Sequence, residues 1–284
     1  MKYFDQCTAL VTGASSGLGL EFARQLAPHA RSLVLVARRL DRLNALRDEL
    51  AGLHPELSVF CYGLDLADEA RVEEFFRWLD ECGLRVDVLV NNAGLGDHCF
   101  FEESDWAKVK RVLDVNILAL TKLTHGILPR MIGMQRAAIL NVSSIVSFVP
   151  VPNMAVYSAT KAYVTSFTEA LRAELRGTKV RVAALCPGPV DTEFRAVAEH
   201  ESGGRLPAPE IFKLPAEKIA RAGLLAIARD RARVIPGLLI AAAMAGACTV
   251  PMFVLRFFLK PQLERGGRNT AAARGTEKRT PART

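Results

Sequence analysis

The feature that most constrains the fold is a glycine-rich turn near the N-terminus. An apolar run of strand length covers 7–11, and a helical pattern covers 20–26. Between them stands the turn Thr12-Gly13-Ala14-Ser15-Ser16-Gly17-Leu18-Gly19. Glycines let a backbone approach a pyrophosphate closely, and the N-terminus of the following helix offers unpaired N–H groups and a positive dipole end. The order of strand, turn and helix therefore favours a phosphate-binding site over a simple turn, with the spacing G-x-x-x-G-x-G.

Strand-like and helical patterns alternate along the chain without a hairpin signal. This alternation predicts an α/β fold, a doubly wound parallel sheet of Rossmann-like type, with the ligand crevice at the carboxyl ends of the strands. Small or polar residues follow several strands at that edge. The expected strands cover 32–37, 58–64, 86–90, 138–142 and 232–236, and the expected helices cover 40–50, 68–82, 106–129, 157–176 and 216–228.

Two arginines, Arg38 and Arg39, follow the strand 32–37. A dinucleotide fold selects its cofactor at this point, about 20 residues after the glycines. An acidic residue would accept hydrogen bonds from a ribose 2′-hydroxyl, whereas a guanidinium pairs with a 2′-phosphate. The sequence therefore favours NADP over NAD. The alternative is that both arginines only open the charged helix 40–50.

The composition indicates a folded intracellular protein. Its 284 residues, half of them hydrophobic, suffice for one large α/β domain or two small ones, and we expect one. The N-terminus lacks the apolar run and cleavage site of a signal peptide, which predicts a cytoplasmic location. Six cysteines lie far apart without a C-x-x-C pair, so we expect neither a metal site nor a disulfide framework.

Positive charge is concentrated towards the C-terminus. The net charge is +7, and residues 256–284 hold eight Lys and Arg against two Asp and Glu, which leaves +1 for residues 1–255. Without a basic face in the body, nucleic-acid binding is not expected. We expect residues 263–284 to form a basic disordered tail, with weak attraction to an anionic membrane or polymer as the alternative.

Tyr157 and Lys161, four residues apart, would lie on the same face of a helix. A neighbouring ammonium favours the phenolate and would lower the tyrosine pKa towards working pH, which makes Tyr157 a candidate acid and base. Alone, the pair also fits a half-buried tyrosine beside a snorkelling lysine on an amphipathic helix. Ser144, thirteen residues upstream of Tyr157, adds a hydroxyl after a predicted strand.

Taken together, the motifs resemble the short-chain dehydrogenase/reductase family over about residues 5–237. They are, in chain order, Thr12-Gly13-x-x-x-Gly17-x-Gly19, Asp65, Asn91-Asn92-Ala93-Gly94, Asn116, Ser144, Tyr157-x-x-x-Lys161 and Pro187-Gly188-Pro189-Val190-x-Thr192. The resemblance implies a single Rossmann-like domain over 1–237, an NADP(H) cofactor, and a homodimer or homotetramer built through the long helices that contain Asn116 and Tyr157.

By resemblance, the catalytic residues are Asn116, Ser144, Tyr157 and Lys161. Hydride from NADPH would reach a carbonyl carbon while Tyr157 donates a proton to the developing alkoxide and Ser144 hydrogen-bonds the same oxygen. Lys161 would lower the tyrosine pKa and bind the nicotinamide ribose, and Asn116 would hold a water that relays protons to solvent. Ser144 is preferred to its neighbour Ser143 because the thirteen-residue offset to Tyr157 is usual in the family.

The resemblance also implies the cofactor contacts. Phosphates would lie against Gly13, Ser15, Ser16, Gly17 and Gly19, the 2′-phosphate against Arg38, the adenine amino group against Asp65, the ribose beside Asn92, and the nicotinamide end beside Tyr157, Lys161, Val190 and Thr192. His98 lies near the expected substrate entrance without a spacing that supports chemistry, and we expect it to line the surface or the pocket.

Two segments lie outside the shared pattern. Residues 193–215, with adjacent glycines and three prolines, are expected to form a lid that shapes substrate choice. Residues 238–262 are expected to form an apolar helical extension, and 237–255 carry no charge over nineteen residues, a length that could span a membrane. The alanine and glycine content, Pro251 and basic residues on both flanks count against a span. A packed helix or lid is therefore expected first, a peripheral membrane contact through 238–260 second and a span last, and an oligomer contact is a further possible use of the segment.

These features predict an NADP(H)-dependent oxidoreductase that interconverts a carbonyl and an alcohol on an apolar ketone, aldehyde or oxoacyl substrate. The apolar preference depends only on the C-terminal segment. The alternative is a catalytically silent NADP-binding regulator or a membrane-associated scaffold with the same fold. The complete catalytic set argues against that alternative, because a pure binder needs the glycines more than a catalytic tyrosine.

Overall fold

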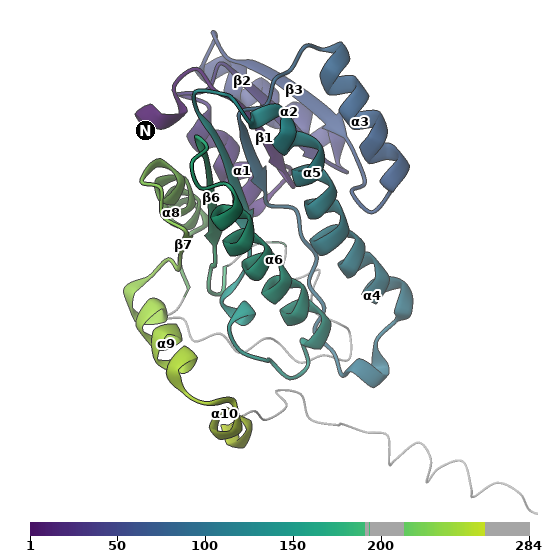
Figure 1. The fold of residues 1–284 in the computed structure, drawn as a ribbon. Coiled ribbons are helices and arrows are strands. Elements are labelled where there is room, and N and C mark those ends of the chain that lie inside the picture. Colours follow the sequence, from purple (N-terminus) through teal and green to yellow (C-terminus); the bar gives the residue numbers. More distant parts are fainter. Residues whose placement is uncertain (191–192, 194–212, 259–284) are drawn as a thin grey trace, which may run out of the picture.

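Seven parallel strands form one sheet at the centre of the protein, in the order β3-β2-β1-β4-β5-β6-β7 (Figure 1). The structure, a computed structural model, describes residues 1–190, 193 and 213–258. Val90 pairs with Val11 on one side and Leu140 on the other, so β4 lies beside β1 and the strand order reverses between them. The strands are β1 Thr8–Thr12, β2 Ser32–Ala37, β3 Ser58–Gly63, β4 Val88–Asn91, β5 Ala137–Val142, β6 Val180–Leu185 and β7 Arg233–Val234.

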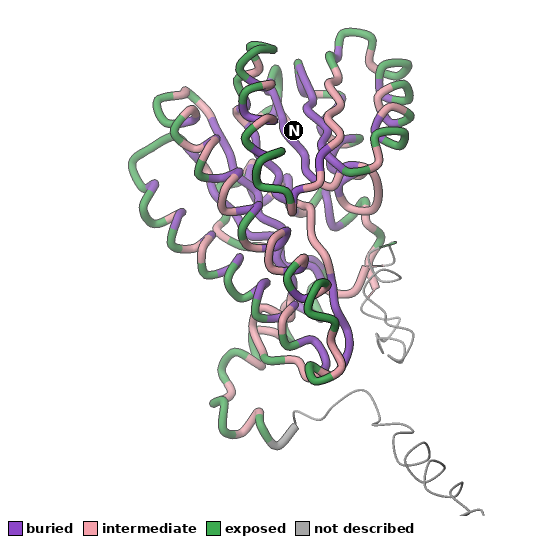
Figure 2. The backbone as a smooth tube through the Cα atoms, turned by 90° about the vertical axis from the view of Figure 1, so that its right-hand side faces the viewer, coloured by how far each residue is buried: buried purple, intermediate pink, exposed green. Residues whose placement is uncertain are grey.

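Helices cover both faces of the sheet, which confirms the doubly wound prediction. One core, which includes Phe22 and Leu224, lies between the sheet and helices α1, α2 and α8. The other, which includes Phe75 and Leu123, lies between the opposite face and helices α3, α5 and α6. Figure 2 shows the buried strands enclosed by helices whose outer faces are exposed. The helices are α1 Gly17–Leu26, α2 Leu40–Leu53, α3 Glu69–Glu81, α4 Trp106–Leu113, α5 Leu120–Met131, α6 Ala155–Glu174 and α8 Ala216–Ala228.

A π-helical turn, η3 (Asp114–Ala119), joins α4 to α5 in a continuous helical segment. The sequence predicts one regular helix over 106–129, and the structure adds this irregularity at its centre. Such turns leave the i→i−4 ladder out of step and are frequent at functional sites. The irregular turn contains Asn116, which is buried.

Two short helices follow the sheet at the C-terminal side, α9 (Leu238–Thr249) and α10 (Met252–Phe258). Figure 1 shows them extending beyond α8 and away from the sheet. Ile240 is the buried residue of α9, while Leu238 is 90% exposed. The prediction of a helix packed on the body is therefore wrong for α9, and the lid, which was ranked with it, stays a prediction. Within 1–190, 193 and 213–258, no helix combines the length and the apolar character that a membrane crossing requires.

Several sequence predictions fall outside the described residues. Most of the predicted lid 193–215, the basic tail 263–284 and the end of the apolar extension belong to this group, as does Thr192. Glu193 and residues 213–215 are described.

Candidate active site

The four predicted catalytic side chains meet where β4 and β5 end. Ser144 follows β5, Tyr157 and Lys161 lie near the start of α6, and Asn116 lies in η3. The side chains of Ser144 and Tyr157 are hydrogen-bonded, and Lys161 Nζ lies 5.8 Å from the centre of the Tyr157 ring. A Cβ added to Gly94 would lie 3.3 Å from Lys161 Nζ and 3.4 Å from Asn116 Oδ1, so both groups border this glycine.

The two adjacent serines have different surroundings. The Ser143 hydroxyl donates to the backbone carbonyl of Lys161 (2.9 Å) and shares a hydrogen bond with Thr165 Oγ1 (2.7 Å), which fastens the end of β5 to α6. The Ser144 hydroxyl instead faces the Tyr157 side chain. Ser144, and not Ser143, therefore contacts the candidate acid, and its catalytic role stays a prediction.

Tyr157 is buried, and burial raises its pKa to about 12, while the hydrogen bond with Ser144 acts in the opposite direction. Burial disfavours a charged phenolate because the surrounding protein solvates it poorly. The shift is opposite in direction to the lowering expected from the Lys161 spacing, because burial is its largest cause. The phenol is therefore a proton donor at neutral pH.

Lys161 is also buried, and its ammonium donates to the Val142 carbonyl (2.9 Å). Burial lowers the pKa of Lys161 to about 8, because the charged form loses hydration that one carbonyl only partly replaces. The lysine can therefore release and take up a proton much nearer to neutral pH than a free lysine.

Both the oxygen and the nitrogen of the Asn116 side-chain amide form hydrogen bonds within the protein. Its Oδ1 accepts from the backbone N–H of Leu95 (2.8 Å), and its Nδ2 donates to the Leu95 carbonyl (2.9 Å) and to Thr160 Oγ1 (3.0 Å). These bonds hold the segment after β4 against α6. Asn116 thus positions the elements around the tyrosine, and the proton relay implied by the resemblance stays a prediction.

Two further asparagines, Asn91 and Asn141, are hydrogen-bonded to each other in the strands below the site. The sequence did not predict that they form a pair. Asn91 Nδ2 donates to Asn141 Oδ1 (2.9 Å) and to Thr124 Oγ1 (3.0 Å), and Asn141 Nδ2 donates to Thr168 Oγ1 (3.0 Å). The chain of bonds ties β4 and β5 to α5 and α6. Asn91 and Asn141 are register partners in β4 and β5, a pairing that no local pattern in the sequence shows.

The glycine turn is shaped by close backbone packing. Gly13 and Gly17 have positive φ angles of 67° and 56°, and a Cβ on Gly19 would lie 2.1 Å from the Gly13 carbonyl oxygen. Asn92 Nδ2 donates to the carbonyls of Thr12 (2.8 Å) and Gly13 (3.5 Å). The Asn92 amide therefore fastens β4 to the turn, a contact that the ribose assignment did not anticipate.

At the end of β2, Arg39 rather than Arg38 makes the hydrogen bonds to the turn. Arg39 Nη2 donates to Ser15 Oγ (3.3 Å) and Ser16 Oγ (3.0 Å), and Nη1 donates to Glu193 (2.9 Å). Arg38 is exposed, and its role at the 2′-phosphate stays a prediction. The paired arginines in the sequence are the signal for Arg39, but they do not show which side chain reaches the turn.

Asp65, the predicted adenine contact, accepts from the Ala67 N–H (3.1 Å) and from Arg111. Partial burial raises the pKa of its carboxyl, but these hydrogen bonds and the positive charges of Arg111 and Arg38 outweigh that effect and lower it. The carboxylate is thus charged and held at the crevice. Arg111, which lies on α4, was not predicted.

The glycine turn and the side chains beside it fit a phosphate-bearing dinucleotide. The turn leaves no room for side chains at Gly13 and Gly19, and the hydroxyls of Ser15 and Ser16 lie beside the Arg39 guanidinium. Hydroxyl, guanidinium and backbone N–H groups are donors suited to phosphate.

Val190, the predicted contact of the nicotinamide carboxamide, packs against the core on the α1 side of the sheet.

The segment after β4 continues into a buried polar cluster. Asp97 Oδ1 pairs with Lys108 Nζ (2.9 Å), and Cys99 Sγ lies 3.5 Å from Asp97 Oδ2. His98 is fully buried, which rules out the surface position, while the alternative that it lines the pocket stays a prediction. Among the described residues, no group of three or more histidine, cysteine or acidic side chains could hold a metal ion.

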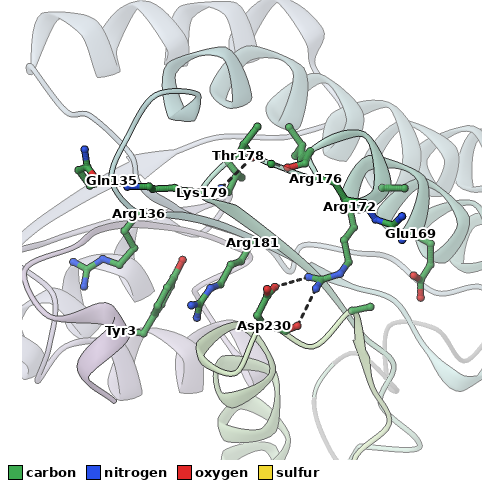
Figure 3. Close-up of a pocket in the computed structure, with 15 residues that line it drawn as sticks. Tyr3, Gln135, Arg136, Glu169, Arg172, Arg176, Thr178, Lys179, Arg181 and Asp230 are labelled. Atoms are coloured by element: carbon green, nitrogen blue, oxygen red, sulfur yellow. Dashed lines mark hydrogen bonds and ion pairs between the residues drawn. The ribbon is translucent and has the colours of Figure 1, made fainter.

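A cleft of about 700 Å³ lies at the opposite edge of the sheet, where β5 and β6 begin (Figure 3). Arg181 donates to two carbonyls at the C-terminal end of α8 (3.2 and 2.8 Å), and its guanidinium lies 4.3 Å from the Tyr3 ring centre. Arg172 donates to the carboxylate (2.7 Å) and the carbonyl (2.9 Å) of Asp230. These arginines complete the hydrogen bonding of a helix end, which is a structural role. The candidate catalytic residues lie at the other edge of the sheet, where β4 and β5 end.

The chain is similar to proteins of known family in both sequence and structure. The chain is 41% identical over 194 residues to the sulfoacetaldehyde reductase of Chromohalobacter salexigens, across 66% of this chain and 74% of that protein. The structure is similar to a short-chain dehydrogenase from Sphingobium yanoikuyae in complex with NADPH, with a TM-score of 0.75, 30% identity, and coverage of 92% of this chain and 98% of that chain. It is also similar to the bulky-bulky ketone specific alcohol dehydrogenase from Comamonas testosteroni, with a TM-score of 0.72, 26% identity, and coverage of 92% and 96%.

Residues 7–203 match the family described as short chain dehydrogenase. The matched range includes the glycine turn, the paired arginines and all four candidate catalytic residues. With the parallel sheet and the site geometry, this match establishes that the chain belongs to the short-chain dehydrogenase/reductase family.

Proposed function

We propose that this protein is an NADP(H)-dependent oxidoreductase that interconverts a carbonyl and an alcohol on an apolar ketone, aldehyde or oxoacyl substrate. The observation that supports it most is the contact of a buried, protonated Tyr157 with the Ser144 hydroxyl, beside the lowered-pKa amine of Lys161. The names of similar proteins, which include an aldehyde reductase and a ketone-specific alcohol dehydrogenase, support the reaction class. The NADPH complex of a similar structure supports the cofactor.

When bound, NADPH supplies the hydride, and the side chains supply a proton and hold the substrate oxygen. Tyr157 Oη gives its proton to the oxygen as negative charge develops there, and Ser144 stabilises that charge with a hydrogen bond. Lys161 then gives a proton to the Tyr157 phenolate, which restores the phenol, and its amine also binds the nicotinamide ribose. Asn116 holds the elements in register and contributes to the proton path.

The cofactor contacts are part of the same proposal. Arg38 and Arg39 bind the 2′-phosphate, Asp65 the adenine amino group, and the turn binds the pyrophosphate. The remaining contacts are Gly13, Ser15, Ser16, Gly17 and Gly19 at the phosphates, Asn92 at the ribose, and Val190 and Thr192 at the nicotinamide carboxamide.

The function is tested by incubating the purified protein with NADPH and a carbonyl panel that contains apolar ketones, long-chain aldehydes, oxoacyl thioesters and sulfonated aldehydes. Loss of absorbance at the NADPH band with an apolar member is the expected result. Turnover only with the sulfonated aldehyde would refute the apolar preference while keeping the reaction class. Tight NADPH binding without turnover across the panel would support the alternative, a silent NADP-binding regulator or scaffold.

We also propose that the protein is a cytoplasmic homodimer or homotetramer built through α4, α5 and α6. Support comes from exposed apolar side chains on α4 and α6: Trp106 is 69% exposed, and Tyr163 stacks on Phe167 at the surface of α6. Light scattering on the full chain tests the oligomer. Peripheral membrane contact through 238–260 is tested by co-sedimentation with anionic vesicles, where a protein that stays in the supernatant would refute it.

A further inference from the structure

A single carboxylate joins two guanidinium groups at the cofactor-selecting end of β2. Arg39 Nη1 donates to Glu193 Oε2 (2.9 Å), and Arg42 Nη1 donates to Glu193 Oε1 (2.7 Å). Each carboxylate oxygen is therefore used by a different arginine. Glu193 is 154 residues from Arg39 and 151 from Arg42 in the chain, so the tertiary fold creates the contact.

The same site is connected to the phosphate turn. Arg39 Nη2 donates to the hydroxyls of Ser15 and Ser16 (3.3 and 3.0 Å), which places its guanidinium between the turn and Glu193. Two guanidinium groups and two hydroxyls form a donor set for a phosphate monoester. Such a group carries a charge of about −1.5 to −2 at pH 7, more than one carboxylate.

The geometry points to Glu193 as a determinant of cofactor specificity. Its carboxylate bonds both Arg39 and Arg42, the guanidinium groups that we assign to the 2′-phosphate of NADP(H), so carboxylate and phosphate would compete for the same donors. The inference rests on the proposed use of NADP(H). It adds Arg42 to the phosphate site and assigns Glu193 a role against phosphate binding.

The competition is weak enough for the phosphate to win. All three side chains are about half exposed, at 41% for Arg39, 43% for Arg42 and 50% for Glu193. Exposed ion pairs are screened by water and salt and contribute little. The two arginines lower the pKa of the Glu193 carboxyl, so the competitor is charged at neutral pH and keeps its effect there.

NADH is the discriminating ligand, because it carries a hydroxyl where NADPH carries the phosphate. A carboxylate accepts a hydrogen bond from a ribose 2′-hydroxyl and repels a phosphate. Glu193 should therefore weaken NADPH binding without weakening NADH binding. The native chain would be less selective for NADPH than its arginines alone would make it.

The test compares dissociation constants of NADPH, NADH and 2′,5′-ADP for the full-length wild type and Glu193→Gln. Loss of the carboxylate should strengthen NADPH and 2′,5′-ADP binding by about three- to tenfold and change NADH binding by less than about twofold. Glu49→Gln is the matched control, since Glu49 is a similarly exposed carboxylate that bonds Arg24 away from this site, and it should change none of the three constants.

A second variant keeps the inference falsifiable. Arg42→Gln should weaken NADPH binding. Glu193→Gln should then improve the NADPH affinity by a smaller factor in the Arg42→Gln background than in the wild type, because the two carboxylate contacts are coupled. Unchanged or weaker NADPH binding in Glu193→Gln, with a normal melting temperature, would overturn the inference. A wild type that binds NADPH no better than NADH would instead overturn the proposed NADP(H) dependence, and the two failures are distinguishable.

Discussion

Proton transfer depends on the protonation states of Tyr157 and Lys161, which burial shifts in opposite directions on the pKa scale. Burial raises the tyrosine pKa to about 12 and lowers the lysine pKa to about 8, so both shifts favour the neutral form of the group. A neutral phenol can donate a proton to a carbonyl oxygen without first being charged. The reducing direction is thus favoured by the site at neutral pH.

The pH dependence should differ between the two directions. Oxidation of an alcohol needs the phenolate, and a pKa above the ordinary value keeps that form scarce at pH 7. We expect kcat for alcohol oxidation to rise from pH 7 to 10 by up to about tenfold per pH unit, while carbonyl reduction stays level or falls. Steady-state rates with NADP+ and with NADPH across this range check it, and an oxidation rate that does not change with pH would contradict it.

The two serines should respond differently to the same substitution. Ser144→Ala removes the hydroxyl that faces Tyr157, and kcat/KM should fall by about a hundredfold with little change in melting temperature. Ser143→Ala removes two bonds between β5 and α6 and should lower the free energy of unfolding by about 1 to 3 kcal/mol. Kinetics and thermal unfolding of both variants are the measurements. Equal catalytic losses would contradict the assignment of Ser144.

The sequence was enough to name candidate site residues, but it did not show which partners their side chains contact. The choice of Ser144 came from the resemblance, in which a thirteen-residue offset to Tyr157 is usual, and its catalytic role stays a prediction. The reach of Arg39 to the turn and its pairing with Glu193 depend on tertiary packing across 154 residues, which no local pattern contains. The tyrosine pKa was mispredicted because spacing shows that a lysine is near but not how far both groups are buried.

Among the elements, the glycine turn is the most demanding. Gly19 lies inside α1, where a Cβ would be 2.1 Å from the Gly13 carbonyl oxygen. Gly52 lies inside α2, where a Cβ would have no neighbour within 4 Å. The two helical glycines therefore form a matched pair.

Gly19→Ala should destabilise the protein by about 2 kcal/mol or more and weaken cofactor binding, since the turn must move. Gly52→Ala should stabilise it by about 0.5 to 1 kcal/mol, since alanine favours a helix over glycine. Chemical denaturation and cofactor titration measure both effects. A neutral Gly19→Ala would mean that the turn is looser than the structure shows.

The elements themselves followed from the sequence to a large degree. Apolar runs between polar turns located the strands, because strands of a parallel sheet are buried on both faces. The π turn at Asn116 was not predictable from periodicity, since the apolar pattern continues through α4 and α5 without a break. The asparagine pair in β4 and β5 was likewise hidden, because register between strands is a tertiary property.

The whole molecule combines a closely packed sheet with an exposed apolar end. Leu238 and Phe253 are 90% and 65% exposed, and α9 and α10 extend away from the body in Figure 1. The sequence located this apolar segment but not its environment, because an alanine-rich helix has no distinct face to indicate what it packs against. Its exposure in a single chain places most of it outside the core.

Deletion of 238–284 should leave the fold in place. Ile240 is the buried side chain of α9, so the melting temperature should fall by only a few degrees, about 2 to 8 °C. NADPH binding should not change. Calorimetry, light scattering and vesicle co-sedimentation compare the two proteins, and a failure to fold would show that the extension is part of the core.

The most direct test of hydride transfer with Tyr157 as the acid is single-turnover oxidation of NADPH by Tyr157→Phe, measured with the best carbonyl of the panel. The phenylalanine keeps the ring and removes the proton, so NADPH should bind with the wild-type dissociation constant while the rate falls by about a thousandfold or more. A rate within a few fold of wild type, at equal NADPH binding, would contradict the assignment of Tyr157 as the proton donor.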